Sequence, residues 1–354
     1  MLDTAELLSL RPAGGHLDGL TRARGRLGAH GWMFEPGHVL ERIDAYLDGQ
    51  PAGPVFSVDR PDVEKAMLCA DGGKPAGFRV EIPLGGTVPL RLDLVGRIAE
   101  APAVRLSCFI PSARDLQAPQ PPPELAKRVS KMQGAEFRTQ GLKMFTDLAD
   151  QMTRLGIHTG GRILDWGCGC GRVASHFQSR LAGARLIGCD IDAQAIEWCR
   201  GHIAGEFVRI DPEPPTPFGD GAADIIVACS VLTHLDAAAQ ERWLLEMRRL
   251  LAPGGSFLAS TNGDFMFQLS WGRGRRARIR SAWRRLTGVG RLRGIRDTQR
   301  DRTLDGIAPK GYYRAVFQSR AYTIDTCSKY FEVVDYVERG LNGHQDLVIL
   351  RRAA

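Results

Sequence analysis

The stretch ILDWGCGCGR at Ile163–Arg172 decides the fold. Its apolar start predicts a short buried strand ending at Asp165, and RVASHFQSRL, which begins at Arg172, predicts a helix. Between them, Gly167, Gly169 and Gly171 alternate with other residues. Glycine is needed where the backbone turns sharply and approaches a ligand closely, because no Cβ stands in the way. Ligands of open parallel sheets bind outside the carboxyl ends of the strands, so the stretch predicts a ligand-binding turn.

The acidic residues around this turn narrow the choice of ligand. The spacing is GxGxG, whereas a dinucleotide site needs GxGxxG and a helix N-terminus facing pyrophosphate. Asp165 would repel pyrophosphate and attract the ammonium group of an amino-acid ligand, which favours S-adenosylmethionine over NAD. Asp190 ends a second predicted strand, and its carboxylate could accept both ribose hydroxyls of either ligand. Asp192 is expected to cap the following helix. An NAD-dependent oxidoreductase remains a poor third option.

The chain around the turn alternates strand and helix patterns. After ILDW, the apolar runs RLIGCDI, FVRI, ADIIVACS and GSFLAS predict further strands, with helices between them. This alternation predicts an α/β fold with a mostly parallel sheet covered on both faces. Near the end, YFEVVDYVER and HQDLVILRR are joined by GLNG, which predicts an antiparallel hairpin that closes the sheet.

The chain before the α/β region divides into shorter stretches. Residues 1–54 are predicted as a helical segment, for example HVLERIDAYLDG, and residues 55–117 as a small β-rich domain with alternating runs such as RVEI and RLDLVGRI. APQPPP at 118–123 predicts a stiff linker. Residues 124–354 are then the α/β domain, which starts with one or two helices over 124–155.

Composition and charge exclude several classes of protein. The 354 residues are 44% hydrophobic and 25% charged, with no apolar run of the ~20 residues that span a bilayer and no signal-peptide pattern. We therefore expect a cytoplasmic protein. The 8 cysteines are scattered, which predicts neither a disulfide framework nor a metal site. The net charge of +7 is concentrated in residues 271–302, an Arg-rich insertion with 12 arginines against Asp297 and Asp301.

Four motifs together resemble the class I S-adenosylmethionine-dependent methyltransferases. ILDWGCGCGR looks like their first motif, GCDID like their acidic ribose motif, PFGDGAADIIVACSVLTHL like their fourth-strand motif, and RRLLAPGGSFLAS like the segment leading into their fifth strand. The resemblance covers residue 124 to the C-terminus, with the motifs in the family's order. It implies a methyltransferase that uses S-adenosyl-L-methionine on a Rossmann-like, seven-stranded sheet, as in bacterial members with small-molecule or glycan-type acceptors.

The resemblance also implies cofactor contacts. Asp165 would contact the methionine amino group, Gly167, Cys168 and Gly169 would form the turn under the methionine and ribose, and Asp190 would bind the ribose hydroxyls. Ile191, Ile210 and Asp211 would border the adenine, Ser230 would face the methionine end, and Phe137 in a lid helix would be a further contact. The sequence departs from the family pattern at DPEPPTPF, where four prolines follow Asp211.

The sequence says less about the residues that would bind the methyl acceptor. His234 in VLTHL is a candidate general base, although a sulfonium methyl donor is already activated and positioning alone can suffice. Tyr312 and Tyr313 could line the acceptor pocket or pack in the core. We expect O-methylation of a small-molecule or glycan-type hydroxyl. The alternatives are a non-catalytic S-adenosylmethionine-binding or scaffold protein, and a nucleic-acid methyltransferase that uses the arginines.

The Arg-rich insertion allows two interpretations. Apolar residues at Ile279, Trp283, Leu286 and Val289 predict a short amphipathic helix with a basic face, which could touch an anionic membrane surface or a phosphate-bearing substrate. The insertion could equally be a solvated loop. Nucleic acid is the less expected partner of these arginines, and the oligomeric state is left open.

Overall fold

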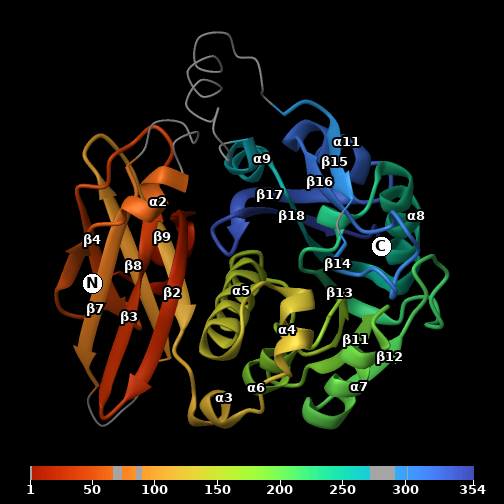
Figure 1. Ribbon diagram of the computed structural model, residues 1–354, viewed down its shortest axis with the longest axis horizontal. Coiled ribbons are helices and arrows are strands. Elements are labelled where there is room, and N and C mark those ends of the chain that lie inside the picture. Colours follow the sequence, from red (N-terminus) through yellow and green to blue (C-terminus); the bar gives the residue numbers. More distant parts are fainter. Residues whose placement is uncertain (1, 67–73, 85–89, 272–291, 301) are drawn as a thin grey trace.

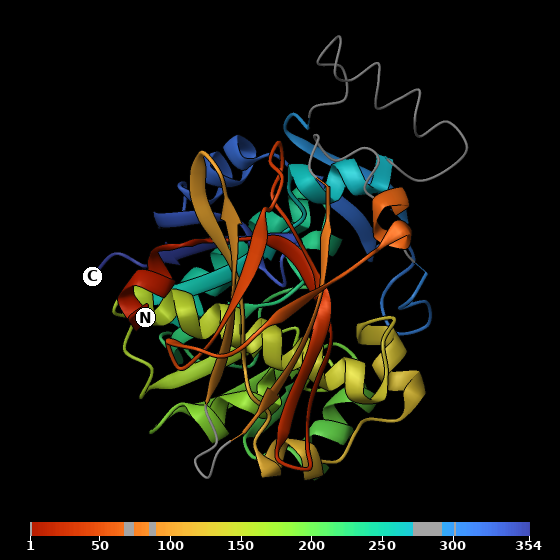
Figure 2. The same ribbon diagram turned by 90° about the vertical axis from the view of Figure 1, so that its left-hand side faces the viewer.

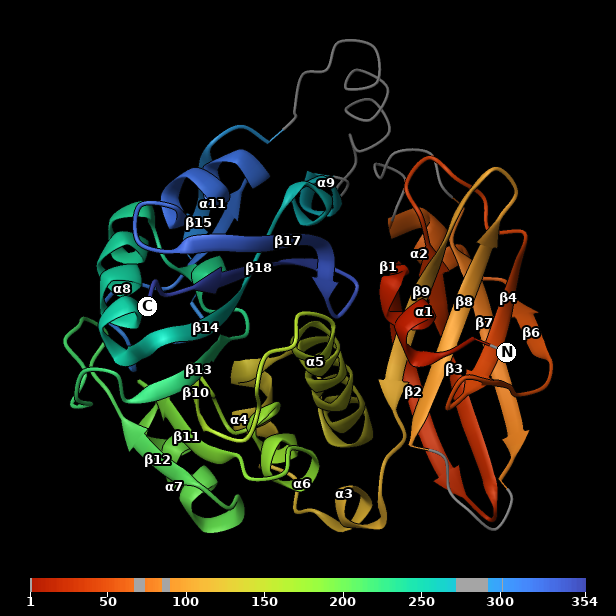
Figure 3. The same ribbon diagram turned by 180° about the vertical axis from the view of Figure 1, so that it is seen from behind.

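The computed structural model describes residues 2–66, 74–84, 90–271, 292–300 and 302–354. A β-sandwich forms its N-terminal part and an α/β unit its C-terminal part, with a long helix between them (Figures 1 and 3). Most of the Arg-rich insertion lies outside the described residues, so its predicted amphipathic helix and its contact with an anionic surface stay predictions. No helix in the described ranges combines the length and the apolar character needed to cross a membrane.

Two sheets face each other in the N-terminal part, and Figure 2 shows them in front of the α/β unit. One sheet has the strand order β1-β9-β8-β4-β5 and the other the order β2-β3-β7-β6. The strands are β1 (Arg11–Pro12), β2 (Gly14–Ala23), β3 (Arg26–Phe34), β4 (Arg42–Leu47), β5 (Gln50–Pro51), β6 (Val55–Val58), β7 (Ala76–Pro83), β8 (Arg91–Ile98) and β9 (Ala101–Phe109), and the helices α1 (Thr4–Ser9) and α2 (Pro61–Ala66) accompany them. Apolar side chains of both sheets, such as Leu17, Phe78, Leu94 and Leu106, form one shared core.

The prediction of a helical segment over residues 1–54 is wrong, because only α1 is helical there. Residues 42–47, which the helical spacing covers, instead pair with β8 as strand β4. Asp48 and Gly49 both have positive φ angles, 47° and 79°, and they form the turn that reverses the chain into β5. An Asp-Gly pair in this conformation is a strong hairpin signal, and the strand pairing outweighed the helical spacing.

The α/β unit contains a seven-stranded sheet of the predicted kind, with the order β12-β11-β10-β13-β14-β18-β17. The strands β10 to β14 are parallel, whereas β18 and β17 are antiparallel to their neighbours, which confirms the predicted closing hairpin. The strands are β10 (Arg162–Trp166), β11 (Arg185–Asp190), β12 (Glu206–Arg209), β13 (Ala223–Ala228), β14 (Leu251–Thr261), β17 (Glu332–Leu341) and β18 (Gln345–Arg351). This order is that of a Rossmann-like sheet with a C-terminal hairpin.

Helices cover both faces of the sheet because side chains of successive strand residues point to opposite sides. Leu164 and Trp166 pack with α8 (Ala237–Leu250) and α11 (Arg320–Cys327), while Ile163 packs with α5 (Gly134–Arg154), α6 (Phe177–Arg180) and α7 (Ala193–His202). The remaining elements are α3 (Ala113–Gln117), α4 (Pro123–Val129), the 3-10 turns η1 (Ala174–His176) and η2 (Leu232–His234), α9 (Asp264–Trp271), β15 (Ile295–Arg300) and β16 (Arg314–Gln318). The Pro-rich segment 118–123 connects α3 to α4, and the domain boundary proposed there stays a prediction.

Candidate active site

The glycine turn follows β10 and favours glycine at three of its positions. Gly167, Gly169 and Gly171 have φ angles of +74°, +53° and +80°, which L side chains rarely adopt. A Cβ at Gly167 would also lie 2.4 Å from Val231, and one at Gly169 would lie 2.6 Å from Val129. The turn is tied to the neighbouring strand, because the Gly167 and Cys168 N–H groups both donate to the Cys189 carbonyl. The turn backbone therefore packs closely between Val231 and Val129 at the end of the sheet.

Asp190 at the end of β11 is fixed by the same turn. One carboxylate oxygen accepts a hydrogen bond from the Gly169 N–H at 2.8 Å, and the other accepts one from the Asp192 N–H at 2.9 Å. Burial raises the pKa of Asp190, and the two N–H donors partly offset this. Each oxygen has a further lone pair, so the oriented carboxylate can accept hydrogen bonds from a ligand.

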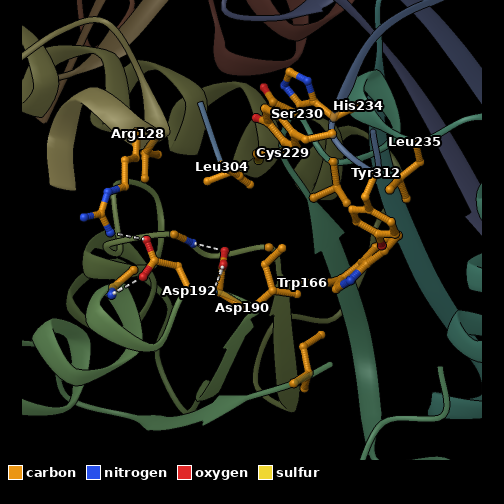
Figure 4. Close-up of a pocket in the computed structure, with 18 of the residues that line it drawn as sticks. Arg128, Trp166, Asp190, Asp192, Cys229, Ser230, His234, Leu235, Leu304 and Tyr312 are labelled. Carbon is orange, nitrogen blue, oxygen red and sulfur yellow. Dashed lines mark hydrogen bonds and ion pairs between the residues drawn. The ribbon is translucent and has the colours of Figure 1, made fainter. Parts of the chain in front are cut away.

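Asp192 caps α7, as predicted, by accepting from the Gln194 and Ala195 N–H groups. It also forms an ion pair of 2.8 Å with Arg128 at the end of α4. Figure 4 shows this pair and the Asp190 contacts on one side of a pocket. The ion pair holds α4 against the glycine turn, where its neighbour Val129 lies beside Gly169.

The pocket itself lies at the carboxyl ends of β10, β11, β12 and β13. Its lining includes seven of the residues predicted from the sequence: Gly167, Gly169, Asp190, Ile191, Ile210, Ser230 and His234. The sequence pattern thus brings together residues from four strand ends, as the carboxyl edge of a parallel sheet requires.

Four predicted residues do not line this pocket. Asp165 is buried beneath the turn, with 2% of its surface exposed, and burial together with Asp190 raises its pKa to about 7. Cys168 points into the core, where its Sγ lies beside Gly188. Asp211 is exposed and borders a separate hollow with Pro215 and Thr216.

Phe137 is buried in a small apolar cluster with Leu125, Ala126 and Cys170. It borders a neighbouring pocket between α3, α5 and the segment after the glycine turn. Its place on a helix that covers the turn is as predicted, but its side chain supports the packing of α4 on α5.

The wall opposite Asp190 carries polar side chains. The Ser230 N–H donates to the Ser260 Oγ at 2.7 Å, and the Ser230 hydroxyl donates to the Gln345 Oε1 at 3.0 Å. His234 Nδ1 lies 2.7 Å from the Arg314 carbonyl oxygen, and the His234 ring stacks on Tyr313 with ring centroids 3.9 Å apart. A carbonyl oxygen only accepts, so Nδ1 carries the proton, and the lone pair of the neutral ring is on Nε2.

Several lining residues had weak or no sequence signals. Leu304 and Tyr312 come from the segment between β15 and β16, and Figure 4 shows Leu304 between Arg128 and Ser230. The Tyr312 hydroxyl donates to the Pro212 carbonyl and accepts from the Trp243 Nε1 at 3.1 Å, which fixes this segment over the pocket. Nothing local in the sequence places residues 302–313 beside the glycine turn.

Comparisons with known proteins agree with this geometry. Residues 163–255 match the family model described as "Methyltransferase domain". The chain is 26% identical over 230 residues to a malonyl-[acyl-carrier protein] O-methyltransferase of Yersinia pestis. The matched region is 62% of this chain and 80% of that protein. It is 36% identical over 102 residues to a fatty-acid O-methyltransferase of Mycolicibacterium smegmatis, or 28% of this chain and 36% of that protein.

Among solved structures, one similar protein is the 1,6-didemethyltoxoflavin-N1-methyltransferase of Burkholderia thailandensis with bound S-adenosylhomocysteine. It has 18% sequence identity and a TM-score of 0.41, covering 60% of this chain and 78% of that one.

Proposed function

The chain belongs to the class I S-adenosylmethionine-dependent methyltransferases, and we propose that it transfers the methyl group to an oxygen atom of a small-molecule acceptor. The observation that carries this proposal is a single pocket with two unlike walls. One wall is the glycine turn with the oriented Asp190 carboxylate, and the other carries Ser230, His234 and Tyr313. The first wall suits a nucleoside, and the second suits a polar acceptor.

The first wall fits S-adenosylmethionine. Because Gly167 and Gly169 have no Cβ to meet Val231 and Val129, the turn packs against these side chains and its backbone still lines the pocket. The Asp190 carboxylate would accept from the ribose hydroxyls, and Ile191 and Ile210 would flank the adenine. When bound, S-adenosylmethionine supplies a methyl group that is already activated on a sulfonium.

The second wall fits an oxygen nucleophile. Two relatives with the name O-methyltransferase act, by their names, on malonyl-[acyl-carrier protein] and on fatty acids, which supports an oxygen acceptor. A hydroxyl must lose its proton during the transfer, and His234 Nε2 is a suitable acceptor for it. The predicted glycan-type acceptor has no counterpart in these names and stays a prediction.

Titration calorimetry with S-adenosylmethionine and S-adenosylhomocysteine tests the proposal, with Asp190→Ala as the control variant. We expect the wild type to bind both ligands and Asp190→Ala to bind both more weakly. Release of S-adenosylhomocysteine in the presence of phenolic, lipid and sugar hydroxyls then identifies the acceptor class. If the wild type bound neither ligand, the proposed function would be wrong.

His234→Asn tests the role of the base. Asparagine can still donate to the Arg314 carbonyl, but it cannot take up a proton. With a hydroxyl acceptor, we expect kcat to fall by about 10²–10⁴-fold while S-adenosylhomocysteine binding stays unchanged. A variant with full kcat on the true acceptor would rule out His234 as the base and leave positioning as the main source of catalysis.

A further inference from the structure

Ser230, on the pocket wall opposite Asp190, has an unusual backbone conformation. It follows β13 with a φ angle of +63°, in the left-handed region that residues other than glycine rarely adopt. The Ser230 N–H donates to the Ser260 Oγ at 2.7 Å, which holds the strained residue in place. Strain of this kind persists where the surrounding structure over-determines a residue, and it is concentrated at functional sites. Ser230 lines the pocket, so its hydroxyl is a candidate for a contact with a ligand.

A chain of hydrogen bonds fixes the direction of the Ser230 hydroxyl. It starts at the Val316 carbonyl, which accepts from the Asn262 Nδ2 at 3.0 Å. The Asn262 Oδ1 is the other end of this amide, and the Gln345 Nε2 donates to it at 3.5 Å. The Gln345 Oε1 therefore faces Ser230 and accepts from its hydroxyl at 3.0 Å. Because an amide oxygen only accepts, the proton of the Ser230 hydroxyl is committed to Gln345.

Gln345 owes its position to the turn between β17 and β18. The Asn342 N–H in this turn donates to the Asp147 carboxylate of α5 at 2.7 Å. The next residue, Gly343, contacts the β-sandwich: its carbonyl accepts from the Gly15 N–H at 3.4 Å, and a Cβ on it would lie 2.6 Å from the Gly15 carbonyl oxygen. Gln345 is the first residue of β18 after this turn. The docking of the hairpin on α5 and on the sandwich therefore sets where the Gln345 side chain starts.

A hydroxyl whose proton is committed can only accept hydrogen bonds from a ligand. His234 has the same polarity, because its Nδ1 proton is directed at the Arg314 carbonyl and Nε2 is an acceptor. The short turn η2 separates Ser230 from His234, and Figure 4 shows both on one wall of the pocket. A ligand group that covers the Ser230 oxygen without donating a proton to it would leave an acceptor unsatisfied, which is costly. This wall therefore favours a ligand with hydrogen-bond donors over an anion.

We propose that Ser230, oriented by Gln345, accepts a hydrogen bond from a second hydroxyl of the methyl acceptor, next to the hydroxyl that is methylated. This inference rests on the proposed function and names its acceptor class as a vicinal diol. One hydroxyl of the diol gives its proton to His234, and its neighbour donates to Ser230. Gln345 is a positioning residue, because it acts on the acceptor only through Ser230. Arg172 also lines the pocket and is a cation that could hold a carboxylate, so carboxylic acids are the competing acceptor class.

The test measures release of S-adenosylhomocysteine with acceptors that differ in one group. Catechol is compared with phenol, which lacks the second hydroxyl, and with guaiacol, whose second oxygen carries no proton. Vicinal cyclohexanediol is compared with cyclohexanol, and benzoate and octanoate are the carboxylates. The proteins are the wild type, Ser230→Gly, which suits the left-handed backbone but lacks the hydroxyl, Gln345→Leu, which releases the hydroxyl proton, and the double variant. Calorimetry gives the Kd of S-adenosylhomocysteine, and thermal unfolding reports on the fold.

We expect kcat/KM of the wild type to be about 10- to 100-fold higher for a diol than for the matching single alcohol. Ser230→Gly should lose this factor, with unchanged S-adenosylhomocysteine affinity and an unfolding temperature at or above that of the wild type, because glycine relieves the backbone strain. Gln345→Leu should lower the factor, since the released hydroxyl can turn its proton toward the ligand. In the Ser230→Gly background, Gln345→Leu should have no further effect on the factor.

Several results would overturn this inference and leave the proposed function standing. They are a preference for carboxylates or single alcohols, a panel in which no diol is methylated, or a Ser230→Gly protein that keeps the diol factor. An equal effect of Gln345→Leu with and without the Ser230 hydroxyl would make Gln345 a structural residue only. A weaker affinity of Ser230→Gly for S-adenosylhomocysteine would assign the serine to the cofactor instead of the acceptor. A wild type that binds neither S-adenosylmethionine nor S-adenosylhomocysteine would overturn the proposed function as a whole.

Discussion

Asp165, which is buried beneath the glycine turn, is a titratable group near neutral pH. Burial and the neighbouring Asp190 raise its pKa to about 7, while Arg172 acts in the opposite direction. The α-ammonium group of S-adenosylhomocysteine has a pKa of about 7.7, so its charge is nearly constant below about pH 6.5. If Asp165 attracts the ammonium group, as the sequence predicts, it must be ionised to do so, and the ionised fraction falls as the pH drops below about 7.

The affinity for S-adenosylhomocysteine should therefore fall as the solution is acidified. Well below pH 7 we expect a loss of up to about tenfold per pH unit, because a proton must leave Asp165 before the ammonium binds. Calorimetry between about pH 5 and pH 6.5, where the ligand's ammonium group stays charged, measures this slope. Asp165→Asn should bind weakly and with a flat profile over that range. If the variant kept the slope of the wild type, another group would be responsible.

At the scale of single residues, the sequence predicted the side chains whose position follows from the sheet. Asp190 and Ser230 come at strand ends, and the edge of a parallel sheet brings such positions together. Asp211 also follows a strand but is not brought to the pocket, because the proline-rich loop leads away from it. We assigned Arg172 no role from the sequence, although this residue also lines the pocket.

Helix α5 contacts the α/β unit with apolar side chains and the β-sandwich with polar ones. Its apolar residues Met144, Phe145 and Leu148 pack on the sheet of the α/β unit. Its polar residues Gln140, Lys143, Asp147 and Asp150, at helical spacing, would be expected to face solvent, yet each is less than 9% exposed. They face the β-sandwich and the C-terminal hairpin, where Gln140 donates to the Leu17 carbonyl at 2.8 Å and Asp147 accepts from the Asn342 N–H at 2.7 Å.

The contact of α5 with the glycine turn predicts that a Gly→Ala change in this helix lowers the stability of the protein. Gly→Ala in a helix normally stabilises a protein by about 0.5–1 kcal/mol. Gly141→Ala should instead destabilise it, by about 1–3 kcal/mol, because the new Cβ meets the Arg172 carbonyl oxygen at 2.2 Å and the turn must shift. The same shift should weaken S-adenosylhomocysteine binding. Urea unfolding and calorimetry measure the two effects.

Gly201 provides the matched control for that variant. It lies in α7, and a Cβ there would have no atom within 4 Å. Gly201→Ala should be as stable as the wild type or more stable, with unchanged ligand affinity. If Gly141→Ala behaved in the same way as Gly201→Ala, the contact between α5 and the turn would not constrain the backbone of the turn.

At the scale of elements, the sequence predicted the α/β unit well and the first fifty residues badly. Parallel strands buried on both faces are near-continuous apolar runs, and ILDW and ADIIVACS can be found in the sequence by this pattern alone. The strands of the sandwich are short and mixed in polarity, so RIDAYL fits a helix or a strand. There the turn chemistry of Asp48–Gly49 decided the structure, and the helical spacing around it was misleading.

At the scale of the whole molecule, a buried charge network joins the β-sandwich to α5. The Asp150 carboxylate accepts from Arg91 at 2.5 and 2.8 Å and from Arg105 at 2.8 Å. Asp93 lies beside both arginines, on the same strand as Arg91. Burial alone would raise the pKa of Asp150, but Arg105 and Arg91 outweigh it and lower the pKa below its usual value. Because Gly141 and Asp150 lie on one helix, this network also steadies the helix that contacts Arg172.

No local pattern in the sequence predicted this junction. Arg91, Arg105 and Asp150 are far apart in the chain, and charged residues in strands and helices are usually solvated. Their pairing follows from the docking of the sandwich on α5, which side-chain periodicity cannot specify. The sequence therefore predicted that a β-rich region precedes the α/β unit, but it gave no information on how the two parts contact each other.

Removing the Asp150 carboxylate should lower the free energy of unfolding of the protein. Asp150→Asn removes one of the two carboxylates that neutralise Arg91 and Arg105 and leaves Asp93 to neutralise both. Breaking a buried pair in this way costs about 3–5 kcal/mol. Glu213→Gln is the control, because its ion pair with Arg242 is about half exposed on both sides and should contribute little.

The effect of Asp150 on stability should also depend on pH. The native pKa of Asp150 is lowered, so its stabilising effect is present above the unfolded value of about 4 and is lost as the pH falls through the native value. The gap between wild type and Asp150→Asn, measured by urea unfolding, should therefore be large at about pH 7 and shrink toward about pH 3. A gap that did not depend on pH, or a variant as stable as Glu213→Gln, would mean that the apolar contacts of α5 hold the two parts together without this network.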